Sequence, residues 1–167
     1  HWDSDLILWP ETAITVLKDQ FQAYLDTINQ EDINNETTLI TGIPYRYTEG
    51  EFKGEYHNSI LAIGTGGGLY HKQKLVPFGE YIPLENAIRG LLPFFDLPMS
   101  SFKKGDESQA LLKVEKKDSL FLIAPFICYE IVYPEFVAKM ARESDMLITI
   151  SNDAWFGDSL GPKQHMA

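Results

Sequence analysis

The chain has 167 residues, of which 44% are hydrophobic and 23% charged, and its net charge is −10. This composition is typical of a globular protein with a core of its own rather than of a disordered one. The negative charge disfavours a nucleic-acid partner and gives no electrostatic reason to bind anionic lipid, because both require clustered Lys and Arg.

The N-terminus and the apolar runs bear on domain organisation. The chain starts at His1, without Met and without a signal-like stretch, so we expect it to be a piece of a longer protein. Its longest apolar run, residues 120–128, is far shorter than the ~20 residues of a membrane-spanning helix. We therefore expect no transmembrane segment within residues 1–167. Because the histidines lack metal-ligand spacing and no cofactor motif is present, we expect neither a metal nor a cofactor.

The first predicted elements place an acidic residue at a strand end. Asp5–Trp9 is a short apolar run that predicts a buried strand. Apolar residues then recur at helical spacing over residues 13–28, and Thr12 is able to cap that helix. Glu11 therefore either lies where open α/β sheets bind ligands, or is a first-turn acid favoured by the helix dipole.

Three further strands are expected in the next hundred residues. Two are Thr38–Pro44 and Tyr56–Ile63, joined by a polar turn at residues 48–54. A third, shorter strand is expected at Ala110–Val114. The glycine-rich residues 64–68 predict a hairpin turn, since they lack the G-K-[ST] ending of a phosphate-binding loop.

Residues 69–81, L-Y-H-K-Q-K-L-V-P-F-G-E-Y, bring two lysines close to a loop that contains Pro and Gly. If a strand runs through them, Lys72 and Lys74 face the same side. They then form either a solvated sheet edge or a cationic group in a pocket, where it can stabilise developing negative charge. Glu80 follows in the loop, whose backbone the Pro and Gly constrain.

An apolar segment covers residues 85–102 and is interrupted by Pro93 and Pro98, which forbid one long helix. Its Leu, Phe and Met side chains are too numerous to be scattered surface residues. The segment is either a loop folded over the core or, within Leu91–Phe102, a mobile arm that contacts lipid.

The only cysteine, Cys128, lies near the end of Ser119–Glu130, an apolar run that predicts a strand leading into a helix. A side chain at this junction lies near the unpaired N–H groups of the helix N-terminus. We therefore expect its thiol to be favoured as the nucleophilic thiolate. The alternative is an inert, small hydrophobic side chain. Pro125 within the strand must sit at a bulge or where no ladder bond is needed.

The last elements repeat the pattern of functional groups at strand ends. Pro134 suits the first position of a helix, and Asp145–Ile150 predicts another buried strand. That strand is followed by the polar and aromatic residues S-N-D-A-W-F-G. Strands and helices in partial alternation indicate an α/β protein.

Three local contexts, in this order, resemble the Glu-Lys-Cys triad of the nitrilase superfamily of carbon–nitrogen hydrolases. They are W-P-E-T-A around Glu11, Y-H-K-Q-K-L-V-P-F-G-E-Y around Lys72, and I-C-Y-E-I-V-Y-P-E around Cys128. The motifs L-V-P-F-G-E-Y-I-P-L-E, F-F-D-L-P-M-S-S-F and I-S-N-D-A-W-F-G resemble the branch of this superfamily that acylates bacterial lipoproteins. The resemblance runs nearly end to end.

This resemblance implies an α/β fold, a nitrilase-like α-β-β-α sandwich that is incomplete in residues 1–167, within a single catalytic domain. It also implies a location at the bacterial inner membrane, with the domain facing the periplasm and carried by helices outside this chain. In the family pattern the catalytic lysine is the one two residues after Tyr70, which is Lys72 rather than Lys74.

The implied activity is that of an N-acyltransferase. Cys128 takes an acyl chain from a phospholipid as a thioester, and the N-terminal amine of a diacylglyceryl-cysteine apolipoprotein then accepts it. Glu11 acts as general base, and Lys72 with the backbone N–H of Tyr129 stabilises the oxyanion. The residues expected to support the site or bind substrate are Glu80, Tyr129, Glu130, Asn152, Trp155 and Phe156.

Two other functions use the same residues differently. A soluble nitrilase-type amidase has the same triad with water as acceptor, and a non-catalytic binding module carries the three residues without using them. The apolar stretch Leu91–Phe102 favours the lipid substrate over the first alternative. Labelling of Cys128 by iodoacetamide at neutral pH, if Glu11→Gln abolished it, would argue against the second.

Overall fold

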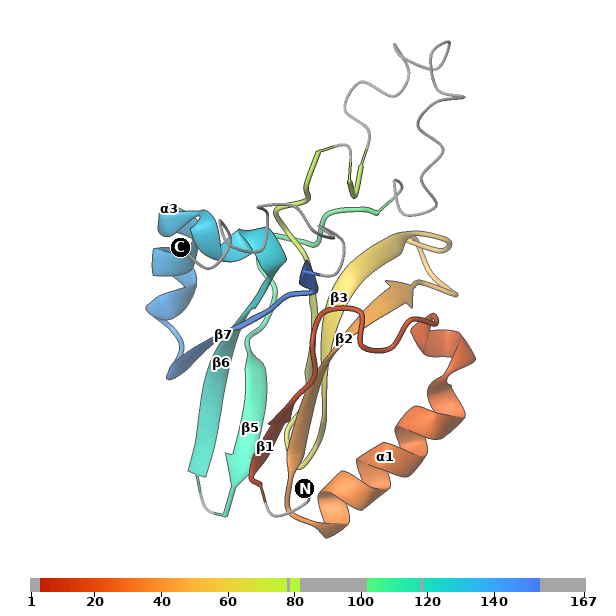
Figure 1. Ribbon diagram of the computed structural model, residues 1–167, viewed down its shortest axis with the longest axis vertical. Helices are drawn as coiled ribbons and strands as arrows, with labels where there is room; N and C mark the ends of the chain where they lie inside the picture. Colours follow the sequence, from red (N-terminus) through yellow and green to blue (C-terminus); the bar gives the residue numbers. More distant parts are fainter. Residues whose placement is uncertain (1–3, 78, 82–101, 118, 154–167) are drawn as a thin grey trace.

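The computed structural model describes residues 4–77, 79–81, 102–117 and 119–153 (Figure 1). None of the helices in these ranges is long and apolar enough to cross a membrane. The elements, with η denoting a 3-10 helix, are β1 (Leu6–Leu8), η1 (Lys18–Gln20), α1 (Gln22–Asn34), β2 (Thr38–Arg46), β3 (Tyr56–Gly64), β4 (Gly68–His71), β5 (Leu112–Lys116), β6 (Ser119–Ile127), η3 (Cys128–Val132), α3 (Pro134–Ala141) and β7 (Met146–Ile150).

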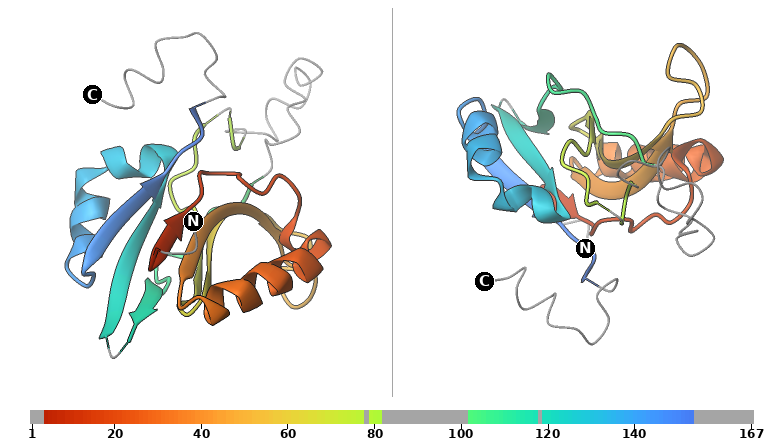
Figure 2. Two further views of the ribbon diagram at one scale, coloured as in Figure 1. Left: turned by 60° about the horizontal axis from the view of Figure 1, so that its bottom comes forward. Right: turned by 90° about the horizontal axis from the view of Figure 1, so that it is seen from above.

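The strands form two sheets that pack face to face (Figure 1). The first sheet has the order β1-β2-β3-β4, with β1 parallel to β2 and the other pairs antiparallel. The second has the order β5-β6-β7, with β6 and β7 parallel. Figure 2 shows α1 outside the first sheet and α3 outside the second. The layers therefore follow the α-β-β-α order, which confirms the predicted fold class.

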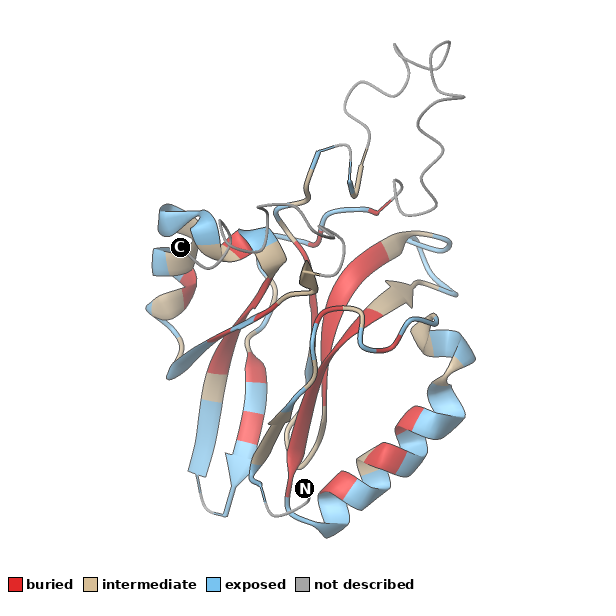
Figure 3. Cartoon of the chain, viewed as in Figure 1, coloured by how far each residue is buried: buried red, intermediate tan, exposed pale blue. Residues whose placement is uncertain are grey.

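The main core lies between the two sheets, and a smaller one lies under α1 (Figure 3). Ile60 of β3 belongs to the first core and Leu61, the next residue, to the second. Successive side chains of a strand point to opposite faces, so β3 is buried on both sides. By the same alternation Asn58 lies on the face of β3 that looks towards the second sheet.

Most predicted strands are confirmed, including β2, β3, β6 and β7, together with the hairpin turn at residues 64–68. The strand predicted at Ala110–Val114 forms two residues later, as β5. Pro134 is the first residue of α3, as expected. Pro125 lies beyond Ile123, the last β6 residue paired with β5, so its missing N–H leaves no gap in that ladder.

The helix predicted over residues 13–28 begins later than expected. α1 starts at Gln22, and Thr12 is no cap, because its φ of 53° places it in the left-handed region. Residues 10–17 instead form turns, and Ile14 joins the same buried cluster as Leu25 of α1. Of the residues that gave the helical spacing, Leu25 and Ile28 are buried on α1, whereas Ala13 and Leu17 precede the helix. Glu11 is therefore not a first-turn helical acid.

Two strands predicted to be buried are partly exposed. Leu8 of β1 keeps 48% of its surface exposed, and Met146 and Leu147 of β7 keep 48% and 42%. Both strands lie at the ends of their sheets in the described chain, where each has a neighbouring strand on one side only.

Candidate active site

Glu11 is held in a tight turn that follows β1 and rests on β2. The turn packs so closely on Gly42 that a Cβ there would lie 2.6 Å from the Glu11 Cα and 2.7 Å from the Pro10 oxygen. Gly42 also donates its N–H to that oxygen at 3.3 Å. Glycine is therefore needed at position 42, and the turn directs Glu11 inward, where only 6% of its surface remains exposed.

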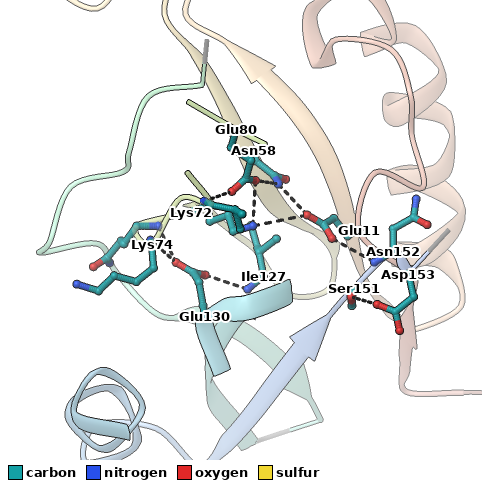
Figure 4. A network of polar contacts seen from close by, with 12 residues as sticks. Glu11, Asn58, Lys72, Lys74, Glu80, Ile127, Glu130, Ser151, Asn152 and Asp153 are labelled. Carbon is teal, nitrogen blue, oxygen red and sulfur yellow. Dashed lines mark hydrogen bonds and ion pairs between the residues drawn. The ribbon is translucent and has the colours of Figure 1, made fainter. Parts of the chain in front are cut away.

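Lys72 is the first residue after β4. Its N–H donates to the Asn58 carbonyl at 2.8 Å, and its side chain is buried, with 1% exposed. The ammonium Nζ donates to Glu80 Oε1 at 2.9 Å and lies 3.9 Å from Glu11 Oε1 (Figure 4). A single cation thus lies between two carboxylates, which offsets the cost of burying all three charges.

Asn58 completes this group and was missed in the sequence. Its Nδ2 donates to Glu11 Oε1 at 2.8 Å and to Glu80 Oε1 at 2.7 Å. Glu80 accepts a further bond at Oε2 from the Val76 N–H at 2.8 Å. The signal that could have found Asn58 is a polar side chain on the buried face of an otherwise apolar strand, since such groups are normally hydrogen-bonded there.

Cys128 is the first residue of η3, directly after β6, and its φ of 54° lies in the left-handed region. The Tyr129 backbone N–H and the Ser151 hydroxyl are hydrogen-bonded to its sulfur. Burial, followed by the nearby Glu11 charge, nevertheless raises the pKa of the thiol. The expectation of a favoured thiolate is therefore wrong: the N–H group is present, but desolvation outweighs it.

Burial likewise raises the pKa of Glu11, although Lys72 and Asn58 act in the opposite direction. A carboxylate with a raised pKa is a better proton acceptor near neutral pH than an ordinary one. Burial also raises the pKa of the Cys128 thiol, so this thiol carries its proton at neutral pH, in the same cavity as the Glu11 carboxylate.

Glu130 ties together the two loops that carry Cys128 and Lys72. Its carboxylate is fully buried and accepts the N–H groups of Gln73, Lys74 and Ile127 at 2.7, 2.9 and 2.9 Å. The Tyr70 hydroxyl adds bonds of 2.9 and 3.0 Å. Its acceptors are occupied by the protein itself, so Glu130 supports the site but is not placed to bind substrate.

The two lysines do not share a face, contrary to the expectation from alternation. β4 ends at His71, so the strand period no longer applies beyond it. Lys72 turns inward, whereas Lys74 is exposed and its Nζ lies 5.5 Å from the centre of the Phe136 ring. Only Lys72 reaches the carboxylates.

Glu11, Lys72, Glu80, Cys128 and Asn152 all line one cavity of about 200 Å³. Its remaining lining comes from Thr12, Asn58, Val76, Gly79 and Phe102. The Asn152 N–H donates to Glu11 Oε2 at 3.1 Å, which closes the acidic side of the cavity (Figure 4). Among the described residues, no three His, Cys, Asp or Glu side chains are grouped as metal ligands.

Some of the expected positions lie outside the described residues. These are Trp155, Phe156 and the Leu91–Ser101 part of the apolar segment. The last residue of that segment, Phe102, is described: it is buried, with 8% exposed, and lines the cavity. Tyr129 contributes its backbone N–H, while its side chain is 47% exposed.

The chain matches the model of the carbon–nitrogen hydrolase family over residues 2–167. It therefore belongs to the carbon–nitrogen hydrolases, the class whose sandwich fold was described above.

Within that family its relatives are apolipoprotein N-acyltransferases. It is 52% identical over 164 residues to the apolipoprotein N-acyltransferase of Pseudomonas paraeruginosa, covering 98% of this chain and 31% of the relative. It is 42% identical over 176 residues to that of Vibrio vulnificus, covering 99% of this chain and 33% of the relative. The chain thus spans about a third of the length of the curated relatives that it matches.

Solved structures support the fold. The C. elegans NitFhit protein matches with a TM-score of 0.59 and 14% identity, over 92% of this chain and 38% of that one. A carbon-nitrogen hydrolase from Helicobacter pylori matches with a TM-score of 0.55 and 20% identity, over 90% of this chain and 49% of that one.

Proposed function

We propose that this chain is the catalytic part of an N-acyltransferase that transfers a fatty acyl chain from a phospholipid to the N-terminal amine of a diacylglyceryl-cysteine apolipoprotein. The observation that carries the proposal is the convergence of Glu11, Lys72 and Cys128 on one buried cavity, in a chain half identical to relatives with that name. The first two residues are 6% and 1% exposed, which suits chemistry in a site that excludes water.

In the first step Glu11 takes the thiol proton of Cys128 and the sulfur attacks the ester carbonyl of the phospholipid. The C–S bond forms as the ester C–O bond breaks, and the lysophospholipid oxygen leaves with the proton from Glu11. The Tyr129 N–H and the Lys72 ammonium stabilise the oxyanion. One such donor is worth roughly 10²–10³ in rate in other enzymes.

In the second step the apolipoprotein amine attacks the thioester. The C–N bond forms and the C–S bond breaks, Glu11 accepts the amine proton, and the thiol of Cys128 is restored. Glu80 holds Lys72 through the 2.9 Å bond in both steps. Because the lysophospholipid leaves before the amine attacks the covalent thioester, the scheme is ping-pong.

The thioester must survive until the amine arrives, so water has to be kept out. Val76 and Phe102 supply an apolar wall to the cavity, and Trp155 and Phe156 are expected to extend it. Both substrates carry lipid chains, which agrees with a place at the bacterial inner membrane, with the site facing the periplasm. The membrane helices would belong to the two thirds of the protein outside this chain.

The test uses the full-length protein with a phospholipid whose acyl chain carries an isotope label. Without an acceptor, we expect mass spectrometry to find one labelled acyl group on Cys128, and none in Cys128→Ala or Cys128→Ser. Addition of a diacylglyceryl-cysteine peptide with a free N-terminal amine should move the label to that amine.

Two results would contradict the proposal. Release of the label as free fatty acid at the same rate with and without the peptide would mean that water is the acceptor, as in an amidase-type hydrolase. Absence of any adduct, together with Cys128 alkylation that is unchanged in Glu11→Gln, would indicate a binding module.

A further inference from the structure

In the described part of the chain, β5 meets the outer edge of β4 only at its start, where Gly67 forms a bridge with Lys113. Beside His71, at the other end of β4, a side chain takes the place of a neighbouring strand. The His71 N–H donates to Gln109 Oε1 at 2.7 Å, and Gln109 Nε2 donates to the His71 carbonyl at 2.7 Å. One glutamine side chain thus satisfies both backbone groups of one strand residue.

This pair of bonds copies the pattern of an antiparallel ladder. There, two facing residues exchange both of their N–H···O bonds. Among neutral side chains only the amides of Asn and Gln combine a planar N–H donor with a carbonyl acceptor. Gln109 therefore acts as a strand neighbour that consists of a single side chain.

The loop around Gln109 is built tightly against the same edge. The Gly105 N–H donates to the Lys72 carbonyl at 2.8 Å, so the loop also holds the next residue along the chain. A Cβ at Gly105 would lie 2.3 Å from the His71 oxygen and 2.5 Å from Gln109 Nε2. Nε2 also donates to the Asp106 carbonyl at 2.9 Å, which fixes the amide in the loop.

The side chain of His71 is fixed as well. Its Nδ1 lies 2.7 Å from Ser59 Oγ and its Nε2 lies 3.2 Å from the Tyr47 hydroxyl. The residue immediately before Lys72 is therefore held by both its backbone and its ring, and the Lys72 N–H is held by the Asn58 carbonyl. The peptide group between His71 and Lys72 is therefore fixed in position.

We infer that Gln109 is a positioning residue for Lys72, because its side-chain amide closes the free edge of β4 and so fixes the peptide from which the lysine extends. The inference rests on the proposed function, in which Lys72 stabilises the oxyanion. Lysine has a long, flexible side chain, so the position of its ammonium group depends on how firmly its backbone is held. A displacement of about 1 Å in an active site can cost roughly 10²-fold in rate.

The test compares Gln109→Met, which keeps the length of the side chain without its hydrogen bonds, with Ser108→Ala in the full-length protein. Ser108 lies in the same loop and bonds only to Asp106 among the described residues. We expect Gln109→Met to speed hydrogen exchange in the peptide containing His71 by at least about 10-fold, since its N–H loses its partner. Ser108→Ala should leave that exchange unchanged.

Two chemical reactions of Cys128 separate positioning from general damage. Acylation by phospholipid passes through an oxyanion, whereas alkylation by iodoacetamide does not. We expect Gln109→Met to slow acylation by about 10- to 100-fold and to change alkylation by less than about 2-fold. An equal fall in both rates would show a collapsed site, and unchanged acylation would show that Gln109 is not needed; either result overturns the inference.

A third readout does not depend on the proposed function. Lys72 is 1% exposed, whereas Lys74 is exposed, so an amine-reactive reagent should label Lys72 far more slowly. Gln109→Met should raise the labelling of Lys72 and leave that of Lys74 unchanged. If the wild-type protein fails to acylate Cys128 but this change in labelling is seen, the proposed function is wrong and the positioning role stands. If labelling of Lys72 does not change, the positioning role is wrong.

Discussion

The backbone N–H of Asn152 donates a hydrogen bond to Glu11 Oε2 at 3.1 Å, although the two residues are 141 positions apart. Glu11 follows β1 of the first sheet and Asn152 follows β7 of the second. The bond therefore joins the two sheets beside the cavity that Lys72 and Cys128 line. The position of Glu11, the proposed base, depends on how the sheets pack, so changes in the sheets as well as in the site should alter activity.

Replacement of the two neighbouring lysines should give unequal results. Lys72→Ala should slow acyl transfer at least ~100-fold more than Lys74→Ala, because only Lys72 reaches the carboxylates and the developing oxyanion. Lys72→Arg should not restore the rate, since a planar guanidinium cannot replace a compact ammonium in a buried site. Single-turnover transfer by the full-length protein measures both. A larger effect of Lys74→Ala would mean that the wrong lysine has been assigned.

The pH dependence of Cys128 alkylation should reflect the raised pKa values of the thiol and of Glu11. Burial raises both pKa values, so the alkylation rate should rise with pH. The rising limb of this pH–rate profile should lie at a higher pH than the ordinary pKa range of a glutamate. The Lys72 charge lowers both pKa values, so Lys72→Met should move the limb to higher pH. Lys74→Met is the matched control and should leave it in place. A limb that moves to lower pH in Lys72→Met would contradict this electrostatic account.

Gly42→Ala should disturb Glu11 without touching its side chain. The added Cβ would lie 2.6 Å from the Glu11 Cα and 2.6 Å from the Thr12 nitrogen. Both are backbone atoms, so the turn itself would have to shift to relieve the clash. We expect a ~10- to 100-fold loss of transfer and a loss of ~1–3 kcal/mol in stability. The control is Gly67→Ala, where a Cβ meets nothing within 4 Å. Transfer that survives in Gly42→Ala would show that the turn has room to move.

Glu130→Gln should destabilise the protein, because it places an amide NH₂ among donors. The carboxylate now accepts three backbone N–H groups and the Tyr70 hydroxyl. Leaving such buried donors unpaired should cost about 2–4 kcal/mol, seen as a lower melting temperature. Exposed Glu135→Gln on α3 should leave the melting temperature unchanged. A stable Glu130→Gln protein without activity would instead show that Glu130 contacts substrate.

Asp32→Asn should stabilise the protein at neutral pH. Asp32 is fully buried, and neither carboxylate oxygen has a hydrogen-bond partner among the described residues. Burial raises its pKa to about 6, above the value in the unfolded chain. Protonation therefore favours the folded state, and stability from this group falls as the pH rises through about 6.

The substitution should accordingly raise the free energy of unfolding by about 1–3 kcal/mol at neutral pH. The gain should vanish once acid has protonated the wild-type carboxyl group. Denaturant unfolding at the two pH values tests this, with exposed Asp26→Asn of the same helix as control. A gain that persists in acid would mean that packing, not charge, is responsible.

The sequence by itself determined most of the strands, the hairpin turn and the motif contexts of Glu11, Lys72 and Cys128, and the family resemblance that those motifs carry implied the order of the layers. Runs such as Thr38–Pro44 and Tyr56–Ile63 have the length and the apolar content of strands and are bounded by turn residues, and this signal is local. A hairpin turn is also local, since it depends on a few glycines. The strands and the turn could be predicted because neighbouring residues alone set them.

The tertiary structure decided the start of α1, the divergence of Lys72 from Lys74, and the roles of Asn58 and Gln109. It also decided the thiol pKa, which burial raises although the helix N-terminus favours the thiolate. For Asn58 and Gln109 the deciding partner lies far away in the chain, Glu11 for the first and His71 for the second. Desolvation and hydrogen bonding depend on which groups the two packed sheets bring together, and no window of sequence contains that information.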